Sequence, residues 1–325
     1  MRYGQKYFTI KHCSTDGTIS ENCGGISGSH TGLGGKCLIY KCSSSGPIGS
    51  YGGGIVGTCS SATDECICTI YECFSSGFIN GFGGGICGSN AGYGISSSVN
   101  NYTIYNCYST GIISGYGGGI CGVNAGCPGS CTIYNCYSVG NIGTLPFGSA
   151  GGICGRCTDS GGSLSISTCY SLGNMIGIFF NNTGGIIGRI IATNFVVNIT
   201  DCYSIGNMSQ YSFGICASLG NSTATVNITR CFTTGYSHFQ NIGTIISYNV
   251  GALTLRDCYS YRFNNSNTLD LSNIFYKKLG VFSRSLWDKS TDKLYPYPKL
   301  KAFRVHPWKS SSYKNYTQQA EFELE

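Results

Sequence analysis

The sequence predicts an all-β fold, a parallel β-solenoid of about nine rungs of about 30 residues each, on three observations. A short unit, apolar-x-Ile-x-x-Cys-aromatic-Ser-x-Gly, recurs nine times at intervals of 27 to 34 residues. Apolar and polar residues alternate before each of its cysteines, whereas a helical apolar period is missing almost throughout. The 50 glycines have no Gly-X-Y period, which excludes collagen. We therefore expect a stacked array rather than a closed globule.

The first expected element of each rung is a short strand that ends before an anchor cysteine. Residues three and five positions before the anchor are apolar in every copy, and the residue between them is mostly Thr, Ser or Asn. This alternation predicts a strand with one buried face, and the anchor thiol should point inward as a small apolar group. The structural cysteine column consists of Cys13, Cys42, Cys73, Cys107, Cys136, Cys169, Cys202, Cys231 and Cys258.

A corner and two further segments should complete each rung. Ser or Thr lies two residues after every anchor, and Gly lies four residues after the first eight. We expect this glycine to adopt a positive φ at the corner. An Ile or Met six residues after the first seven anchors predicts a second inward face, and Gly-Gly-Ile-x-Gly follows in six copies, as in residues 84–88. The variable stretches between copies are expected to be surface loops.

The chain should divide into a β-solenoid array at 1–262, a capping segment at 263–302 and a polar tail at 303–325 that could be disordered. Ten of the 20 basic residues follow Arg262, against six acidic ones. We interpret them as part of a solvated tail, so no nucleic-acid partner is expected. No segment resembles a signal peptide or is long and apolar enough to span a membrane.

The combination of Cys-Tyr-Ser-x-Gly-x-Ile with Gly-Gly-Ile-x-Gly resembles the GLUG repeat family. Trp287 and residues 295–300, Tyr-Pro-Tyr-Pro-Lys-Leu, are similar to the segment that closes many such arrays. The resemblance covers about residues 8–302. It implies a relationship to non-catalytic regions of bacterial immunoglobulin-A-cleaving metallopeptidases and to large surface or adhesin-like proteins. The Cys-rich and Asn-rich composition more weakly resembles proteins of large DNA viruses. The implied location is extracellular, at a cell surface or at a virion surface.

The 21 cysteines have two interpretations, buried thiols or disulfides. We expect the column cysteines to serve mainly in packing, and the loop cysteines to be the better disulfide candidates. The loop set is Cys23, Cys59, Cys66, Cys127 and Cys157. Cys154-Gly-Arg-Cys157 lacks the context of a redox motif, and no paired set has zinc-site spacing. No metal and no cofactor are therefore predicted.

An enzymatic alternative depends on one pair of carboxylates. Asp201 and Asp257 precede anchors two rungs apart, so they should lie roughly 9–10 Å from each other, near the separation in inverting glycosidases. This spacing keeps a polysaccharide-acting β-helix hydrolase or lyase as the alternative function. Arg230 should lie between the two aspartates, and a ladder of alternating charge is the simpler interpretation. We therefore assign no catalytic residue.

Tyr40, Tyr71, Tyr105 and Tyr134 occupy the position two residues before four consecutive anchors. They should face away from the Ile column, either as simple ring stacking or as a stripe that contacts sugars or proteins. Our leading hypothesis is a non-enzymatic structural or adhesive surface protein with protein or glycan ligands. End-to-end self-association is a third hypothesis. The sequons that would make it a glycoprotein in a secretory context begin at Asn101, Asn181, Asn198, Asn207, Asn221, Asn227, Asn264 and Asn315.

Overall fold

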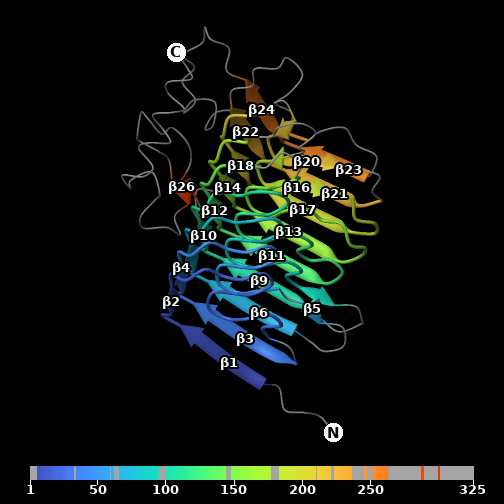
Figure 1. The fold of residues 1–325 in the computed structure, drawn as a ribbon. Coiled ribbons are helices and arrows are strands. Elements are labelled where there is room, and N and C mark those ends of the chain that lie inside the picture. The colour runs from blue at the N-terminus through green and yellow to red at the C-terminus, as the bar shows by residue number, and fades with distance from the viewer. Residues whose placement is uncertain are drawn as a thin grey trace.

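The computed structural model describes residues 6–32, 34–58, 60–61, 66–94, 100–143, 148–176, 183–209, 211–220, 223–235, 245–246, 252–262, 287–288 and 299–300. Across these ranges all regular elements are strands, and they wind into a parallel β-solenoid. Figure 1 shows the strands stacked from the blue N-terminal end to the orange C-terminal end. The predicted fold class is confirmed.

The first sheet contains nine parallel strands, one for each copy of the repeat, in sequence order. They pair in register, so that Ile70 lies beside Ile39 on one side and Ile104 on the other. The inward residues of the middle strands are buried, which confirms the alternation seen in the sequence. The strands are β1 (Lys6–Lys11), β3 (Gly35–Tyr40), β6 (Cys66–Tyr71), β9 (Asn101–Tyr105), β11 (Ser130–Tyr134), β13 (Ser163–Ser167), β17 (Val196–Thr200), β21 (Thr225–Thr229) and β23 (Ala252–Arg256).

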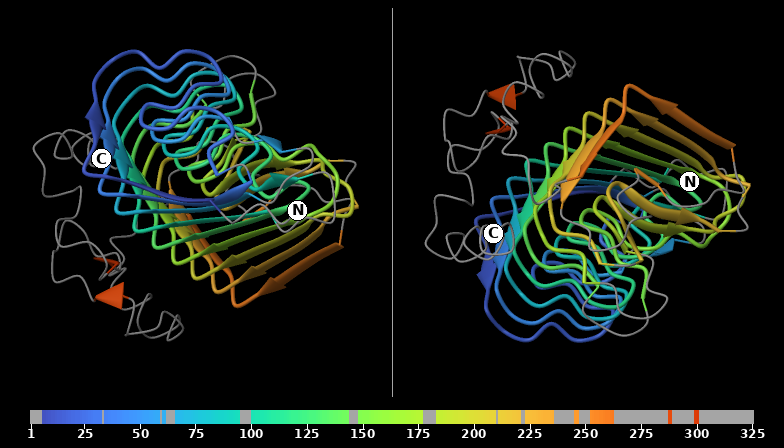
Figure 2. Two further views of the ribbon diagram at one scale, coloured as in Figure 1. Left: turned by 90° about the horizontal axis from the view of Figure 1, so that it is seen from below. Right: turned by 90° about the horizontal axis from the view of Figure 1, so that it is seen from above.

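The second sheet also has nine parallel strands and begins directly after the anchor cysteines. Viewed along the stacking direction, the strands of each sheet lie above one another (Figure 2). The strands are β2 (Ser14–Thr15), β4 (Ser43–Ser44), β7 (Phe74–Ser75), β10 (Tyr108–Ser109), β12 (Tyr137–Ser138), β14 (Tyr170–Ser171), β18 (Tyr203–Ser204), β22 (Phe232–Gly235) and β24 (Tyr259–Arg262).

The third face is formed by the Gly-Gly-Ile-x-Gly segments, which pair as single bridges such as Gly84 with Gly118. It approaches the second sheet closely, because a Cβ at Gly85 would lie 2.6 Å from Oγ of Ser109. Glycine is therefore required there by space. Short strand pairs extend the pattern: β5 (Ser60–Ser61) with β8 (Tyr93–Gly94), β15 (Thr183–Gly184) with β19 (Ser212–Phe213), and β16 (Ile187–Ile190) with β20 (Cys216–Leu219).

The number of complete turns is slightly smaller than the number of strands. The inward column six residues after the anchors has seven members: Ile19, Ile48, Ile79, Ile113, Ile142, Met175 and Met208. About seven turns therefore have all of their faces described, whereas each of the two main sheets contains nine strands.

The corner between the two sheets differs from the prediction. The residue before each anchor cysteine is left-handed in all nine copies, with φ between 50° and 56°, from His12 to Asp257. None of the glycines four residues after the anchor has a positive φ, so the expectation for them was wrong. In the rungs after the first, these glycines are needed because neighbouring rungs touch: a Cβ at Gly111 would overlap the carbonyl group of Gly77.

The segment after residue 262 is described only at a short antiparallel pair. This pair joins β25 (Trp287–Asp288) to β26 (Lys299–Leu300), which links the two ends of the Trp…Tyr-Pro segment. The rest of the predicted capping segment, and all of 303–325, lie outside the described residues, as do Lys277 and the other basic residues near it. Within the described part of the chain, no helix is long and apolar enough to cross a membrane.

Candidate functional site

A tyrosine ledge, defined as Tyr40, Tyr71, Tyr105 and Tyr134, runs along the outer side of the first sheet. Each ring belongs to the last residue of its strand, in β3, β6, β9 and β11. Consecutive ring centroids lie 4.9, 5.0 and 4.9 Å apart, with interplanar angles of 7°, 6° and 2°. All four side chains are half-buried. The structure thus brings together the four residues predicted from the sequence.

The stacking determines what the ledge can offer a ligand. Because each inner ring is sandwiched between two others, it presents its edge and hydroxyl group rather than its face. At the N-terminal end, the ring of His12 lies edge-on to Tyr40 at 5.9 Å. At the other end, Tyr134 pairs in register with Ser167, which carries no ring. The ledge therefore ends in a ring face that is not stacked by any ring of the described residues.

Burial raises the pKa of the Tyr105 and Tyr134 phenols, and the neighbouring Tyr134 adds to the rise for Tyr105. A raised phenol pKa keeps the hydroxyl group protonated. Tyr105 and Tyr134 therefore present neutral hydroxyls, which can donate and accept hydrogen bonds at physiological pH.

A second aromatic column, one residue after the anchors, stacks in the same way. Its rings become buried from Phe74 toward Tyr170. Phe74 and Tyr108 lie 5.2 Å apart, and Tyr137 and Tyr170 lie 5.0 Å apart. Phe74 is 37% exposed, whereas Tyr170 is fully buried. Among the members of this column whose burial is described, Phe74 at the N-terminal end is the most accessible to a ligand.

The sequence interpretation missed a third column, formed by Tyr51, Phe82 and Tyr116. Their centroids are 4.6 and 4.9 Å apart, and the guanidinium carbon of Arg156 lies 5.2 Å from the centroid of Tyr116. Each ring lies three residues after an inward Ile, which is the pattern that could have revealed them. Arg156 covers one end of this column by a cation–π contact.

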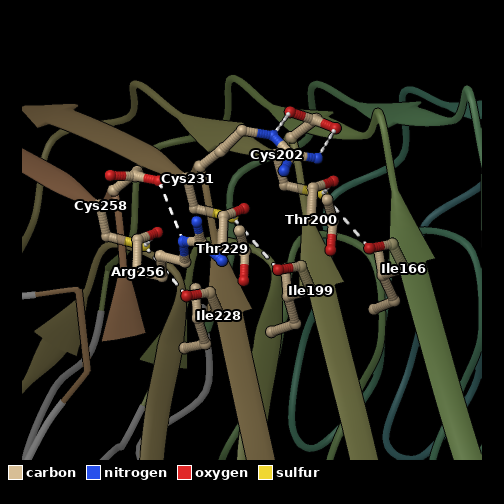
Figure 3. Close-up of polar contacts among 12 residues, drawn as sticks. Ile166, Ile199, Thr200, Cys202, Ile228, Thr229, Cys231, Arg256 and Cys258 are labelled. Atoms are coloured by element: carbon tan, nitrogen blue, oxygen red, sulfur yellow. Dashed lines mark hydrogen bonds and ion pairs between the residues drawn. The ribbon is translucent and has the colours of Figure 1, made fainter. Parts of the chain in front are cut away.

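The anchor cysteines form the predicted inward column, and seven of the nine are buried. In all nine, Sγ lies 3.2–3.4 Å from the carbonyl oxygen two residues earlier. A second carbonyl, on the preceding rung, lies 3.3 Å from Cys258, 3.6 Å from Cys231 and 3.7 Å from Cys202 (Figure 3). The thiol is thus a weak donor at the left-handed corner as well as a packing group.

Burial raises the pKa of the Cys136 and Cys202 thiols well above the ordinary value, and raises that of Cys154 to about 11. Such thiols are protonated and unreactive at neutral pH. They are suited to packing and offer no activated nucleophile.

The disulfide prediction was wrong for one pair. The structure joins Cys37 to Cys68, two strand cysteines that lie five residues before their anchors, while the loop cysteines Cys23, Cys66, Cys127 and Cys157 are free. Cys59 lies outside the described residues. Cys37 and Cys68 are direct partners in register on β3 and β6, with Cα atoms 4.7 Å apart, inside the range a disulfide requires.

The two carboxylates of the enzymatic alternative, Asp201 and Asp257, each form an ion pair with an arginine. Nε and a terminal nitrogen of Arg230 donate to the two carboxylate oxygens of Asp201, both at 2.7 Å. Asp257 lies 3.5 Å from Nε of Arg256. Figure 3 shows Arg256 next to Cys258, and a dashed line marks its ion pair. The predicted charge ladder is therefore present between Asp201 and Arg230. Among the described residues, no group of three or more His, Cys, Asp or Glu side chains could hold a metal ion.

Comparisons with known proteins add one structural likeness. No protein-family model matches this chain, and no curated protein sequence matches it. Among solved structures, it is similar to the crystal structure of a "putative immunoglobulin A1 protease" from Bacteroides ovatus. The two share 18% identity with a TM-score of 0.42, over 91% of this chain and 87% of that chain.

Proposed function

We propose that this β-solenoid is a non-enzymatic structural or adhesive protein that contacts protein or glycan ligands through the tyrosine ledge. The observation that carries the proposal is the row of four half-buried rings whose edges and hydroxyls face outward at intervals near 4.9 Å. Tyrosine supplies apolar contact area and a hydrogen-bonding tip while losing little conformational entropy on binding.

The geometry favours an extended ligand that lies along the stacking direction. Such a ligand meets one hydroxyl for each rung, and the open face of Tyr134 gives a sugar or aromatic ring a place to stack at the end. Thr69, Thr103 and Thr132 lie two residues before Tyr71, Tyr105 and Tyr134 on the same outward side of the sheet, and their hydroxyls widen the polar surface.

The absence of catalysis is part of the proposal. Asp201 is engaged by Arg230 through both oxygens, so neither a free general base nor a protonated acid is supported there. No observation favours the hydrolase or lyase alternative over the charge ladder.

Membership of the GLUG family is also a proposal, supported by the Gly-Gly-Ile-x-Gly segments that line the third face. The location is proposed to be extracellular, at a cell or virion surface. The Cys37–Cys68 disulfide supports an oxidising compartment.

The test is a screen of the intact chain against a glycan array and a panel of surface proteins, followed by the double variant Tyr71→Ser/Tyr105→Ser. We expect at least about a tenfold loss of affinity for the ligand found, since two central contacts disappear. Phe82→Ser is the matched control, because it removes a ring from the third column instead. Undiminished binding by the double variant contradicts the role of the ledge. Glycan cleavage that disappears in Asp201→Asn contradicts the non-enzymatic assignment.

A further inference from the structure

We propose that the two ends of the solenoid bind each other between copies of this chain, so that β23 of one copy pairs in parallel with β1 of the next. The inference rests on the exposure of both end rungs and on their complementary edges. It does not depend on the tyrosine ledge.

Both end strands expose apolar residues that are buried in the middle rungs. At the N-terminal end, Phe8 is 40% exposed and Ile10 is half-buried. At the C-terminal end, Leu255 is 48% exposed and Leu253 is half-buried. The equivalent residues Cys68 and Ile70 are fully buried, because a rung covers them on each side.

The two exposed edges are opposite edges of the same sheet. In the described strands, β1 pairs only with β3 and β23 only with β21. A parallel array can therefore grow by adding β1 after β23, which keeps Leu253 beside Phe8 and Leu255 beside Ile10. An exposed strand edge of this kind is a template for pairing with another chain.

The corner hydrogen bonds predict the contact in detail. The N–H of the residue before each anchor donates to the next rung, as Lys41 donates to the carbonyl of Tyr71 at 3.2 Å and Arg230 to that of Arg256 at 2.9 Å. Asp257 is the last member of this series, and no described residue accepts from its N–H. In the assembly its acceptor would be the carbonyl of Lys11 in the next copy.

The side chains at the junction carry mixed charge. Asp257 would meet His12, whose ring N–H can donate a hydrogen bond to the carboxylate, at the position where Arg230 donates to Asp201. Lys11 and Arg256 would also meet and repel each other. The apolar contact and the main-chain hydrogen bonds must outweigh this repulsion, so we infer a moderate affinity rather than an obligate assembly.

Because the two surfaces differ, the contact is heterologous and does not close on itself, and it produces open chains of copies. We expect the weight-average mass in sedimentation experiments to rise with concentration beyond that of a dimer. A mass that stays at 34.5 kDa at all concentrations overturns the proposal.

Two blocked variants test the polarity. Phe8→Lys blocks the N-terminal end and Leu255→Lys blocks the C-terminal end, so each alone should remain monomeric. An equimolar mixture should form dimers and nothing larger, because one good end of each kind remains. Tyr7→Ser, on the outward side of β1, is the control and should still form chains. Association lost in only one variant indicates pairing of like ends and contradicts the proposal.

The register can be tested by a disulfide that copies the Cys37–Cys68 pair. Phe8 and Leu253 occupy the same position in their rungs as Cys37 and Cys68. Mixing Phe8→Cys with Leu253→Cys should give a covalent dimer whose linked peptides are identified by mass spectrometry. Association without this link contradicts the proposed register, and folding of each variant is checked by its thermal unfolding.

Discussion

The first sheet has the same inward side along its whole length but two different outward sides. Ile39, Ile70, Ile104 and Ile133 in the N-terminal half continue as Ile166, Ile199, Ile228 and Leu255 in the C-terminal half. Outward, the N-terminal half carries the tyrosine ledge, whereas the C-terminal half carries Ser, Thr and Asn, with Asn227 donating to Asn198 at 3.0 Å. The inward columns therefore specify the coil, and the outward columns are free to vary.

The outward columns are alike in one respect. In each, outward side chains contact matching side chains on the neighbouring rung, either of the same kind or of opposite charge. Rings stack on rings in the first half, and an amide pair and a bidentate ion pair replace them in the second. Since rungs lie about 4.8 Å apart, almost any stackable chemistry fits. The sequons at Asn198 and Asn227 lie on this outward side, in β17 and β21.

The largest expected effect tests whether the inward side of the coil excludes added side-chain atoms equally in both halves of the solenoid. A Cβ at Gly111 would overlap the carbonyl of Gly77, and one at Gly206 would overlap that of Gly173. We expect Gly111→Ala and Gly206→Ala each to lower the free energy of unfolding by more than about 4 kcal/mol, or to prevent folding. Denaturant unfolding measures both.

Gly17→Ala is the matched control, because Gly17 holds the same position in the end rung and no atom lies within 4 Å of its added Cβ. It should be neutral or stabilise by up to about 1 kcal/mol, through the unfolded state. A similar loss in Gly17→Ala would show that rung contact is not the cause.

A smaller effect is expected from alkaline pH. The pKa of Cys154 is about 11 in the folded protein against 9.0 for an ordinary thiol. Below pH 9 both states keep the proton. Between pH 9 and 11 only the unfolded state loses it, so the free energy of unfolding should fall by about 3 kcal/mol for this thiol. Unfolding midpoints from pH 7 to 11 measure the fall, and Cys154→Ala should reduce it.

The anchor thiols should contribute equally in the two halves. Cys136→Ala and Cys202→Ala each remove a fully buried sulfur and a donor to a corner carbonyl, at a cost of about 1–2 kcal/mol. Cys13→Ala, at the exposed end, should cost less than about 0.5 kcal/mol. Unequal losses at Cys136 and Cys202 in thermal unfolding would show that the outward side also matters to the coil.

The sequence predicted the strands, their register and the inward columns, because each depends on a residue type repeated at a fixed spacing. It did not predict the left-handed residue before each anchor, since His12, Glu72, Thr168 and the others share no side-chain chemistry. The conformation is imposed by the corner, not by the residue. The Thr168 hydroxyl also donates to the side-chain oxygen of Asn135 at 2.6 Å and accepts from its backbone N–H at 3.1 Å, yet its φ matches that of the other copies.

The candidate site was predictable as a set of residues but not as a surface. Four tyrosines at one position in consecutive repeats must stack, so the ledge followed from spacing. The third column was hidden, because Tyr51, Phe82 and Tyr116 lie outside the repeated unit that defined the alignment. The Cys37–Cys68 disulfide was not predicted, because spacing alone does not distinguish two adjacent thiols from a bonded pair.

The smallest effect concerns the outward charges, and it compares the halves directly. Arg230 binds Asp201 through two hydrogen bonds, with side chains 33% and 14% exposed, whereas Lys41 and Glu72 lie 3.9 Å apart and are 51% and 45% exposed. Arg230→Gln should therefore lower the free energy of unfolding by about 1 kcal/mol, and Lys41→Gln by about 0.3 kcal/mol or less. Both losses should shrink in 1 M salt, where the screening length is about 3 Å. If Arg230→Gln instead costs as much as the loss of a buried thiol at any salt concentration, the outward columns help to specify the coil, and the division between strict inward and variable outward sides does not hold.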